Sequence, residues 1–297
     1  MGAGSRELDV VVEGMTFTEC PRWRDGRLVF ADFYTHRVLA VVPGDEPEQI
    51  VTVPNQPSGL GWLPDGRMLV VSMLDRKVLR LEASGELVEH ADLSGIAGGS
   101  VNDMVVGPSG IAYAGNFGFD LMAAEPPRPA RLARIDPDGT ASVAAEGLLF
   151  PNGSAITPDG STLIISESFG NRMSAFDIAS DGSLGPRRDW AALGPPPEPG
   201  QGLDALAFAP DGMCLDADGA VWVADSLGDR VLRLAEGGEV LEEIAVGEGC
   251  YACMLGGDDG CTLFICVAPD FHAEARRSAR EARILATTVE VPHAGTP

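Results

Sequence analysis

Basic residues are scarce in this chain of 297 residues, which has 21 Lys and Arg against 44 Asp and Glu and a formal net charge of -23 at pH 7. Such a charge repels phosphate backbones and anionic lipid surfaces, so it argues against nucleic acid and membrane partners. Lysine occurs once, at Lys77, and a Schiff-base mechanism would depend on that residue alone. A solvated acidic surface explains the charge without identifying a site.

The chain also lacks a long hydrophobic run at its start, and it has only six cysteines. Charged residues interrupt the apolar ones over residues 1–15, so this segment predicts neither a secretory signal nor a membrane span. Six cysteines are few for a disulfide scaffold of this length. We therefore expect a cytoplasmic protein with reduced thiols. Cys250 and Cys253 have the spacing of a redox or metal motif, but no second such pair occurs, and we interpret them as packed thiols.

Histidine is equally sparse, with four residues scattered along the chain and no metal-ligand spacing among them. The sequence has no Gly-x-Ser-x-Gly motif, which would mark the nucleophile of a serine hydrolase. No glycine-rich nucleotide-binding signature leads from a strand into a helix. A serine-histidine triad and a dinucleotide cofactor are therefore disfavoured.

A tight turn followed by a short β-rich run recurs six times in the sequence. Asp-Gly and Ser-Gly tolerate the positive φ angles of hairpin turns, so each copy predicts a strand, a turn and a second strand. A third strand that begins with Arg or Lys follows each copy after a polar loop. The turns are Asp25-Gly26, Asp65-Gly66, Ser109-Gly110, Asp159-Gly160, Asp218-Gly219 and Asp259-Gly260.

Successive turns are separated by 40, 44, 50, 59 and 41 residues, a spacing typical of four-stranded propeller blades. We predict an all-β fold, a six-bladed β-propeller with four-stranded antiparallel blades, as one domain over residues 1–297. Residues 8–12 would add an edge strand that fastens the first blade to the last. The proline-rich segment 194–200 is expected to be a loop and a candidate lid, and residues 270–283 a short exposed helix without a functional role.

Equivalent positions in the repeats have side chains with oxygen atoms. Counting seven residues back from the turn selects Ser58, Asn102, Asn152 and Asp211, and six back in the first repeat selects Glu19. In the last repeat the same count reaches Cys253 or Ala252. Oxygen ligands of this kind suit one hard divalent cation, Ca²⁺ above all, with Mn²⁺, Mg²⁺ and Zn²⁺ as alternatives. The structural alternative is that Asn-Gly and Asp-Gly only make turns here.

Several segments together resemble the SMP-30/gluconolactonase family, which includes regucalcin-like proteins and comprises calcium-dependent propeller hydrolases. They are Glu19-Cys-Pro-Arg-Trp23, Pro57-Ser-Gly-Leu-Gly-Trp62, Asn102-Asp103, Phe150-Pro-Asn-Gly153, Pro210-Asp-Gly-Met213 and residues 216–224. The resemblance implies that Glu19, Asn152 and Asp211 bind the metal and that Asn102 lies in the metal or substrate shell. Sugar-lactonase members have an arginine two residues before the position of Asn102, where this chain has Ser100.

We therefore expect a metal-dependent hydrolase that opens a small lactone or related ester. The cation would polarise the carbonyl while water attacks, with Asp211 as base or water-orienting group and Glu19 as principal anionic ligand. Asp103 would orient the ligands. Asn102, Ser100, Trp23 and Phe117 are candidate substrate contacts, although blade packing also explains the two aromatic residues. A phosphotriesterase using the same ion, and a non-catalytic calcium-binding propeller, stay open as alternatives, as does the oligomeric state.

Overall fold

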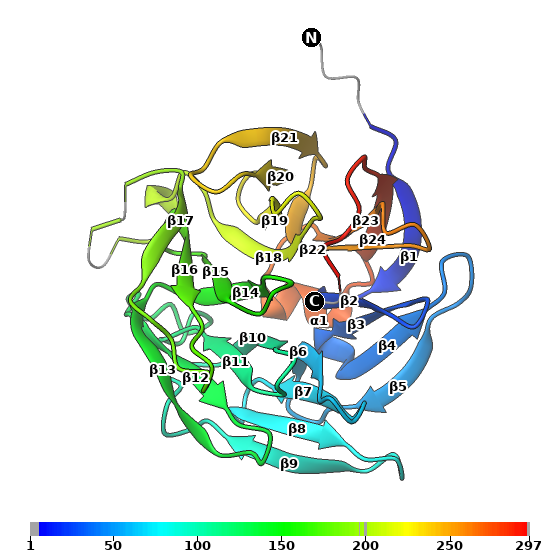
Figure 1. The fold of residues 1–297 in the computed structure, drawn as a ribbon. Coiled ribbons are helices and arrows are strands. Elements are labelled where there is room, and N and C mark those ends of the chain that lie inside the picture. Colours follow the sequence, from blue (N-terminus) through cyan, green and yellow to red (C-terminus); the bar gives the residue numbers. More distant parts are fainter. Residues whose placement is uncertain (1–5, 196, 199–200, 296–297) are drawn as a thin grey trace.

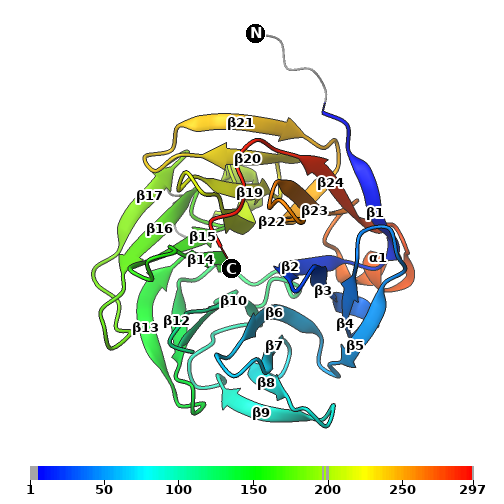
Figure 2. The same ribbon diagram turned by 45° about the vertical axis from the view of Figure 1, so that its right-hand side comes forward.

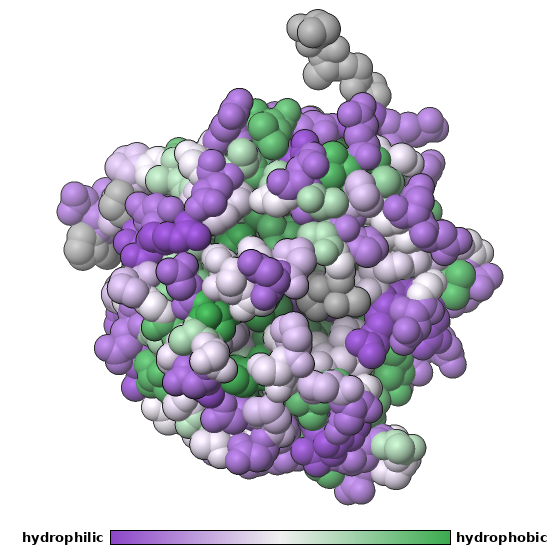
Figure 3. Space-filling model, in the orientation of Figure 1, coloured by the Kyte–Doolittle hydropathy of each residue, from purple (hydrophilic) through white to green (hydrophobic). Residues whose placement is uncertain are grey.

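The computed structural model describes residues 6–195, 197–198 and 201–295. Six antiparallel sheets of four strands each are arranged around a central axis, and the innermost strand of every sheet faces that axis (Figure 1). The predicted all-β, six-bladed propeller is confirmed. On the face shown in Figure 3, hydrophilic residues are concentrated toward the periphery.

The blades follow one another along the chain. Blade 1 contains β2 (Thr18–Arg24), β3 (Arg27–Asp32), β4 (Arg37–Val41) and β5 (Glu48–Thr52). Blade 2 contains β6 (Pro57–Trp62), β7 (Met68–Ser72), β8 (Lys77–Leu81) and β9 (Leu87–Asp92). Blade 3 contains β10 (Val101–Val106), β11 (Ala112–Asn116), β12 (Ala130–Ile135) and β13 (Ala141–Leu148).

The second half of the chain repeats this order. Blade 4 contains β14 (Pro151–Ile156), β15 (Thr162–Glu167), β16 (Arg172–Asp177) and β17 (Arg188–Ala192). Blade 5 contains β18 (Pro210–Leu215), β19 (Val221–Asp225), β20 (Arg230–Leu234) and β21 (Val240–Ala245). Blade 6 contains β22 (Gly249–Gly256), β23 (Thr262–Ala268), β24 (Ala282–Thr288) and β1 (Asp9–Met15). The helical segments are η1 (Phe33–Thr35), η2 (Leu203–Ala205) and α1 (Ala273–Ser278).

The ring closes through its first strand. β1 pairs antiparallel with β24, with Asp9 opposite Ala286 and Met15 opposite Ala282, so the start of the chain forms the outer edge of the last blade (Figure 2). This is the role expected for residues 8–12. Because β2 then begins the first blade, the pairing ties both ends of the chain into the same part of the ring.

The basic residue that begins the third strand has a buried carboxylate as its partner in three blades. The second strand of three blades ends in a buried carboxylate, which also accepts a hydrogen bond from a backbone N–H of the segment leading into the innermost strand: Phe17 in blade 1, Leu149 in blade 4 and Ala209 in blade 5. The resulting ion pairs are Arg37–Asp32, Arg172–Glu167 and Arg230–Asp225. In these three blades the carboxylate therefore holds the start of the innermost strand in place.

Helices are short. The predicted helix in residues 270–283 is present as α1, and none of the helices in the described ranges is long and apolar enough to cross a membrane. The candidate lid over 194–200 includes residues 196, 199 and 200, which lie outside the described residues, so its role stays a prediction.

Candidate metal centre and active site

Four of the predicted site residues meet in one cavity of about 280 Å³ at one end of the ring axis. Each comes from the innermost strand of a different blade: β2, β10, β14 and β18. Their exposed fractions are only 6 to 8%, so their polar groups are largely removed from bulk water. We call these residues the oxygen set: Glu19, Asn102, Asn152 and Asp211.

A β-bulge in each innermost strand explains how these side chains reach the axis. The pairing register of β14 breaks between Pro151 and Ser154, and that of β18 breaks between Pro210 and Met213. Asn152 and Asp211 lie inside these breaks, and a bulge re-aims a side chain without ending the strand. The structural alternative, that Asn-Gly and Asp-Gly only make turns here, is therefore wrong at these two positions, because both pairs lie within strands.

The glycines that follow Asn152 and Asp211 are required by the neighbouring blade. A Cβ atom on Gly153 would lie 2.4 Å from the carbonyl oxygen of Asp211, and one on Gly212 would lie 2.4 Å from the Cβ of Ala252. The innermost strands thus approach one another closely around the axis, which brings side chains from distant repeats within reach of a common centre.

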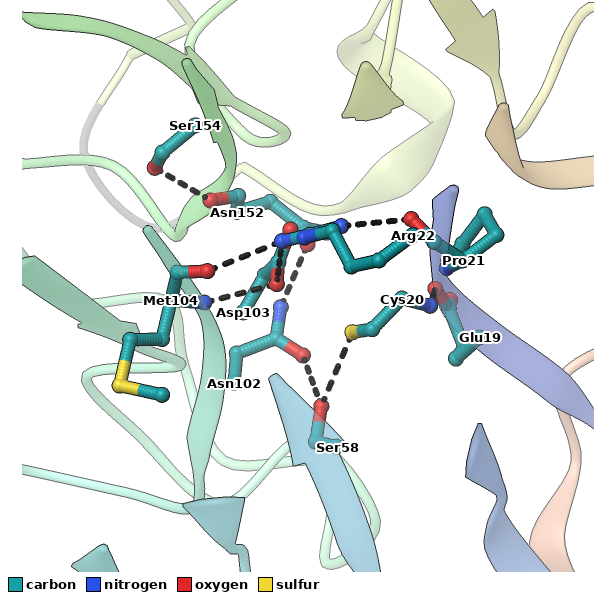
Figure 4. Close-up of polar contacts among 10 residues, drawn as sticks. All are labelled: Glu19, Cys20, Pro21, Arg22, Ser58, Asn102, Asp103, Met104, Asn152 and Ser154. Carbon is teal, nitrogen blue, oxygen red and sulfur yellow. Dashed lines mark hydrogen bonds and ion pairs between the residues drawn. The ribbon is translucent and has the colours of Figure 1, made fainter. Parts of the chain in front are cut away.

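Hydrogen bonds connect the two amides of the oxygen set. Asn102 donates through Nδ2 to Oδ1 of Asn152 at 2.7 Å (Figure 4), and Asn152 donates to Ser168 Oγ at 3.1 Å. Ser168 in turn donates to the carbonyl of Pro210 at 2.7 Å. Ser58, the equivalent residue of blade 2, donates through Oγ to Oδ1 of Asn102 at 3.5 Å (Figure 4). The amides are therefore held in place by neighbouring blades.

The two carboxylates are less well satisfied than the amides. Glu19 accepts a hydrogen bond from the backbone N–H of Cys20, whereas Oδ1 of Asp211 is buried and has no hydrogen-bond partner among the described residues. Burial raises the pKa of Glu19 well above its ordinary value, and the negative charge of Asp211 raises it further. Burial and the charge of Asp103 raise the pKa of Asp211. A bound cation would relieve both effects.

Asp103 lies outside the cavity lining and is already neutralised. Its Oδ1 accepts hydrogen bonds from Arg22 and from the backbone N–H of Met104, both at 2.7 Å, and Arg22 also donates to the carbonyls of Pro21 and Met104 (Figure 4). Arg22 and Asp103 are both buried. Among the described residues this ion pair leaves Glu19 and Asp211 as the buried carboxylates of the cavity lining without a cationic partner, and their charge is the one that a divalent ion balances.

The sequence analysis did not identify Arg22 as part of this region. Arg22 lies in β2, three residues after Glu19, and its ion-pair partner is 81 residues further along the chain. Local sequence could only have suggested that a buried arginine needs a partner, without indicating which one.

The predicted substrate contacts are divided by the structure. Asn102, Ser100 and Phe117 line the cavity. Trp23 is not among the lining residues; its ring stacks on Phe264 with 5.5 Å between centroids. Trp23 is the second-last residue of β2, next to the hairpin turn, whereas Glu19 is the second residue of the same strand. We therefore do not retain Trp23 as a substrate contact.

In the last blade the sequence count selected residues that do not line the cavity. The bulge of β22 lies between Cys250 and Ala252, so Tyr251 faces the cavity in place of Ala252 or Cys253. Cys253 donates instead to the carbonyl of Trp222 at 3.3 Å, and all six cysteines are free. Burial raises the pKa of Cys253, in keeping with the interpretation of a packed thiol.

The helix α1 was expected to lack a functional role, yet its residues Ala273 and Arg277 line the cavity.

The donor set fits a hard cation better than a transition metal. No group of three His, Cys, Asp or Glu side chains able to hold an ion occurs in the part of the chain that the structure describes. The oxygen set instead combines two carboxylates with two amides, and carboxylate and amide oxygens are characteristic calcium ligands. The unpartnered Oδ1 of Asp211 is an independent sign that a ligand belongs there.

Fold and site define a six-bladed propeller with an oxygen-lined cavity at one end of its axis. The chain matches the SMP-30/Gluconolactonase/LRE-like family over residues 17–269 and belongs to that family. The match includes every member of the oxygen set.

Individual relatives agree with this assignment. A 6-deoxy-6-sulfogluconolactonase of Pseudomonas putida is 28% identical over 97% of this chain and 96% of its own length. A regucalcin of Danio rerio is 26% identical over 86% of this chain and 84% of its own length. The solved structure of a calcium-binding regucalcin from Agrobacterium tumefaciens superposes with a TM-score of 0.79 at 20% identity, covering 99% of this chain and 97% of that one, which shows the shared fold.

Proposed function

We propose that this protein is a divalent-cation-dependent lactonase. The observation on which the proposal rests is the oxygen set itself: two buried carboxylates and two hydrogen-bonded amides from four blades line one cavity, and Oδ1 of Asp211 lacks a partner. The family membership and the lactonase relative from Pseudomonas putida support the same reaction class.

Glu19, Asn102, Asn152 and Asp211 would hold the cation, and we assign Ca²⁺ to it because the donors are all oxygens and a relative is described as calcium-binding. When bound, the cation supplies Lewis-acid polarisation of the lactone carbonyl. The buried Arg22–Asp103 pair neutralises Asp103, so Glu19 and Asp211 are the buried carboxylates that would balance the charge of the cation.

Side chains of the protein would orient the attacking water and transfer its proton. Asp211 has a free acceptor atom, Oδ1, to which a water molecule can donate, and this orients the water's oxygen toward the carbonyl carbon of a bound lactone. As the new carbon–oxygen bond forms, Asp211 takes the water's proton. When the ring carbon–oxygen bond breaks, that proton passes to the leaving alkoxide, and the product is a hydroxy acid. Asn102 and Asn152 keep fixed positions through their mutual hydrogen bond.

The test is hydrolysis of a panel of lactones and phosphotriesters in calcium buffer, with and without a chelator. We expect lactone turnover that chelation abolishes and added Ca²⁺ restores. Asp211→Asn and Glu19→Gln should each lower kcat/KM by about a thousandfold or more, because each removes one of the two charges that hold the cation. Asp45→Asn, a change to an exposed loop carboxylate, is the matched control and should leave turnover intact.

Lactone turnover that persists in Asp211→Asn or in excess chelator would contradict the proposal. Faster turnover of phosphotriesters than of any lactone would assign the same site to phosphoryl chemistry instead.

A further inference from the structure

One wall of the cavity consists of stacked phenylalanines. Phe117 and Phe150 lie with ring centroids 4.3 Å apart and an interplanar angle of 20°, and Phe150 and Phe169 have centroids 5.3 Å apart. All three line the cavity, and Phe119 packs behind them. These rings come from the loops after β11, β13 and β15, so two neighbouring blades build this wall next to Asn152. We call Phe117, Phe150 and Phe169 the phenylalanine wall.

Aromatic side chains also line the opposite side. Phe17 packs against Tyr251 with centroids 4.7 Å apart and against Phe33 at 5.3 Å, and these three rings line the same cavity. The oxygen set therefore lies between two aromatic surfaces. A ligand whose carbonyl reaches the oxygen set must place its remaining atoms against these rings.

Three polar side chains of the cavity lining are engaged by the protein. Ser168 donates to the carbonyl of Pro210, Ser226 donates to the carbonyl of Ala209, and Gln56 donates to the sulfur of Met73. A hydroxyl group placed against the phenylalanine wall would have no polar partner there, and an unpaired buried hydroxyl is unfavourable, whereas Tyr34, Asp120, Tyr251 and Arg277 supply polar atoms elsewhere in the lining. Ser100, which lines the cavity, offers one short hydroxyl side chain.

Exposed apolar side chains also line the cavity, together with the exposed Asp120 and Arg277. Leu74, Met122 and Leu227 line it and are 55%, 54% and 42% exposed, which makes them three of the few large hydrophobic side chains that this protein leaves in water. They come from the loops of blades 2, 3 and 5 on the side of the ring where the oxygen set lies. Exposed apolar side chains gathered around one cavity indicate an apolar ligand.

We propose that the substrate is a lactone with an apolar ring substituent, an alkyl chain or an aryl group, that lies against the phenylalanine wall. This inference rests on the proposed lactonase function and assigns its substrate class. The volume of about 280 Å³ is at the lower end for small-molecule sites, so the substituent is short. Phe117 is the specificity-determining residue, because it is the partly exposed member of the wall whereas Phe150 and Phe169 are buried.

The experiment compares δ-valerolactone, δ-nonalactone and glucono-δ-lactone as substrates of the calcium-loaded protein. Each methylene placed against the wall should raise kcat/KM by about two- to fourfold, so δ-nonalactone should exceed δ-valerolactone by more than about tenfold. Glucono-δ-lactone should be the poorest of the three. Phe117→Ala should lower kcat/KM for δ-nonalactone by about tenfold and change that for δ-valerolactone by less than about twofold.

The matched control is Trp62→Ala, which removes a partly buried aromatic ring that lines a different cavity. It should leave the ranking of the three substrates unchanged. A preference for glucono-δ-lactone, or an equal effect of Phe117→Ala on the substituted and unsubstituted lactones, would overturn the inference.

A binding measurement separates this inference from the proposed function. The δ-lactam with the butyl substituent of δ-nonalactone resists hydrolysis, and its affinity for the calcium-loaded protein can be measured by calorimetry. We expect it to bind at least about tenfold more tightly than the unsubstituted lactam, and Phe117→Ala to remove that difference. If no lactone is hydrolysed, the proposed function is wrong, while equal binding of the two lactams contradicts the inference about substrate class.

Discussion

The substitution Gly153→Ala tests how closely the innermost strands approach at the site. The added Cβ would lie 2.4 Å from the carbonyl oxygen of Asp211, 2.7 Å from the Cα of Gly212 and 2.8 Å from the backbone nitrogen of Met213. All three are backbone atoms of β18, so no side chain can move aside. Gly153 does not have a left-handed φ, and the substitution therefore perturbs packing without adding backbone strain.

The loss of unfolding free energy can be estimated from how far the two strands must move to accommodate the added Cβ. Ordinary contact distances demand that β14 and β18 separate by on the order of 1 Å, and overpacking of this kind costs about 3 kcal/mol of unfolding free energy. Asn152 and Asp211 lie in the strands that must separate. A misplacement of that size lowers catalysis by about a hundredfold.

Urea denaturation and lactone kinetics measure the two effects in one preparation. Gly95→Ala is the matched control, because a Cβ there meets nothing within 4 Å, and it should change the unfolding free energy by less than about 1 kcal/mol. Unaltered stability and activity of Gly153→Ala would show that the blades are not held this close, and the argument from strand approach would fail.

Three further predictions follow from the site. In chelator, the pKa values of Glu19 and Asp211 are raised in the folded protein, so the folded state binds more protons than the unfolded state and the free energy of unfolding should fall as the pH rises above about 4. Asp211→Asn should reduce that slope in denaturation measured between pH 5 and 8, and an equal slope in the variant would contradict the assignment. Arg22→Met should destabilise the protein by about 3 to 5 kcal/mol because it leaves Asp103 buried and unpaired, and Arg22→Met with Asp103→Leu should recover part of that loss in the same denaturation assay. Trp23→Leu should cost about 2 kcal/mol of stability through its lost stacking yet leave kcat/KM within about twofold, and a larger kinetic effect would return Trp23 to the substrate cavity.

The sequence predicted the ring and the oxygen set because both follow from repetition. Each repeat places its turn at a nearly constant distance from the bulge of the innermost strand, so a fixed count reached Asn102, Asn152 and Asp211 without knowledge of the fold. The count was wrong in the last blade because the bulge of β22 lies further from its turn, which brings Tyr251, eight residues before Asp259, to the cavity.

Other parts of the site depend on contacts that the sequence does not encode locally. The phenylalanine wall is assembled from three loops of two blades, and only Phe117 was named as a candidate. Trp23, proposed as a substrate contact from its nearness to Glu19 in sequence, lies outside the cavity lining and stacks on Phe264, because residues close in sequence can lie toward opposite ends of one strand. The Arg22–Asp103 pair joins blades whose strands are far apart along the chain.

The most direct test of the account is the position of a divalent ion in crystals grown with Mn²⁺ and located by anomalous scattering. We predict one strong peak inside the cavity, within coordination distance, about 2 to 2.6 Å, of carboxylate oxygens of both Glu19 and Asp211 and next to the amides of Asn102 and Asn152. A peak elsewhere on the molecule with none between these two carboxylates would contradict the central claim.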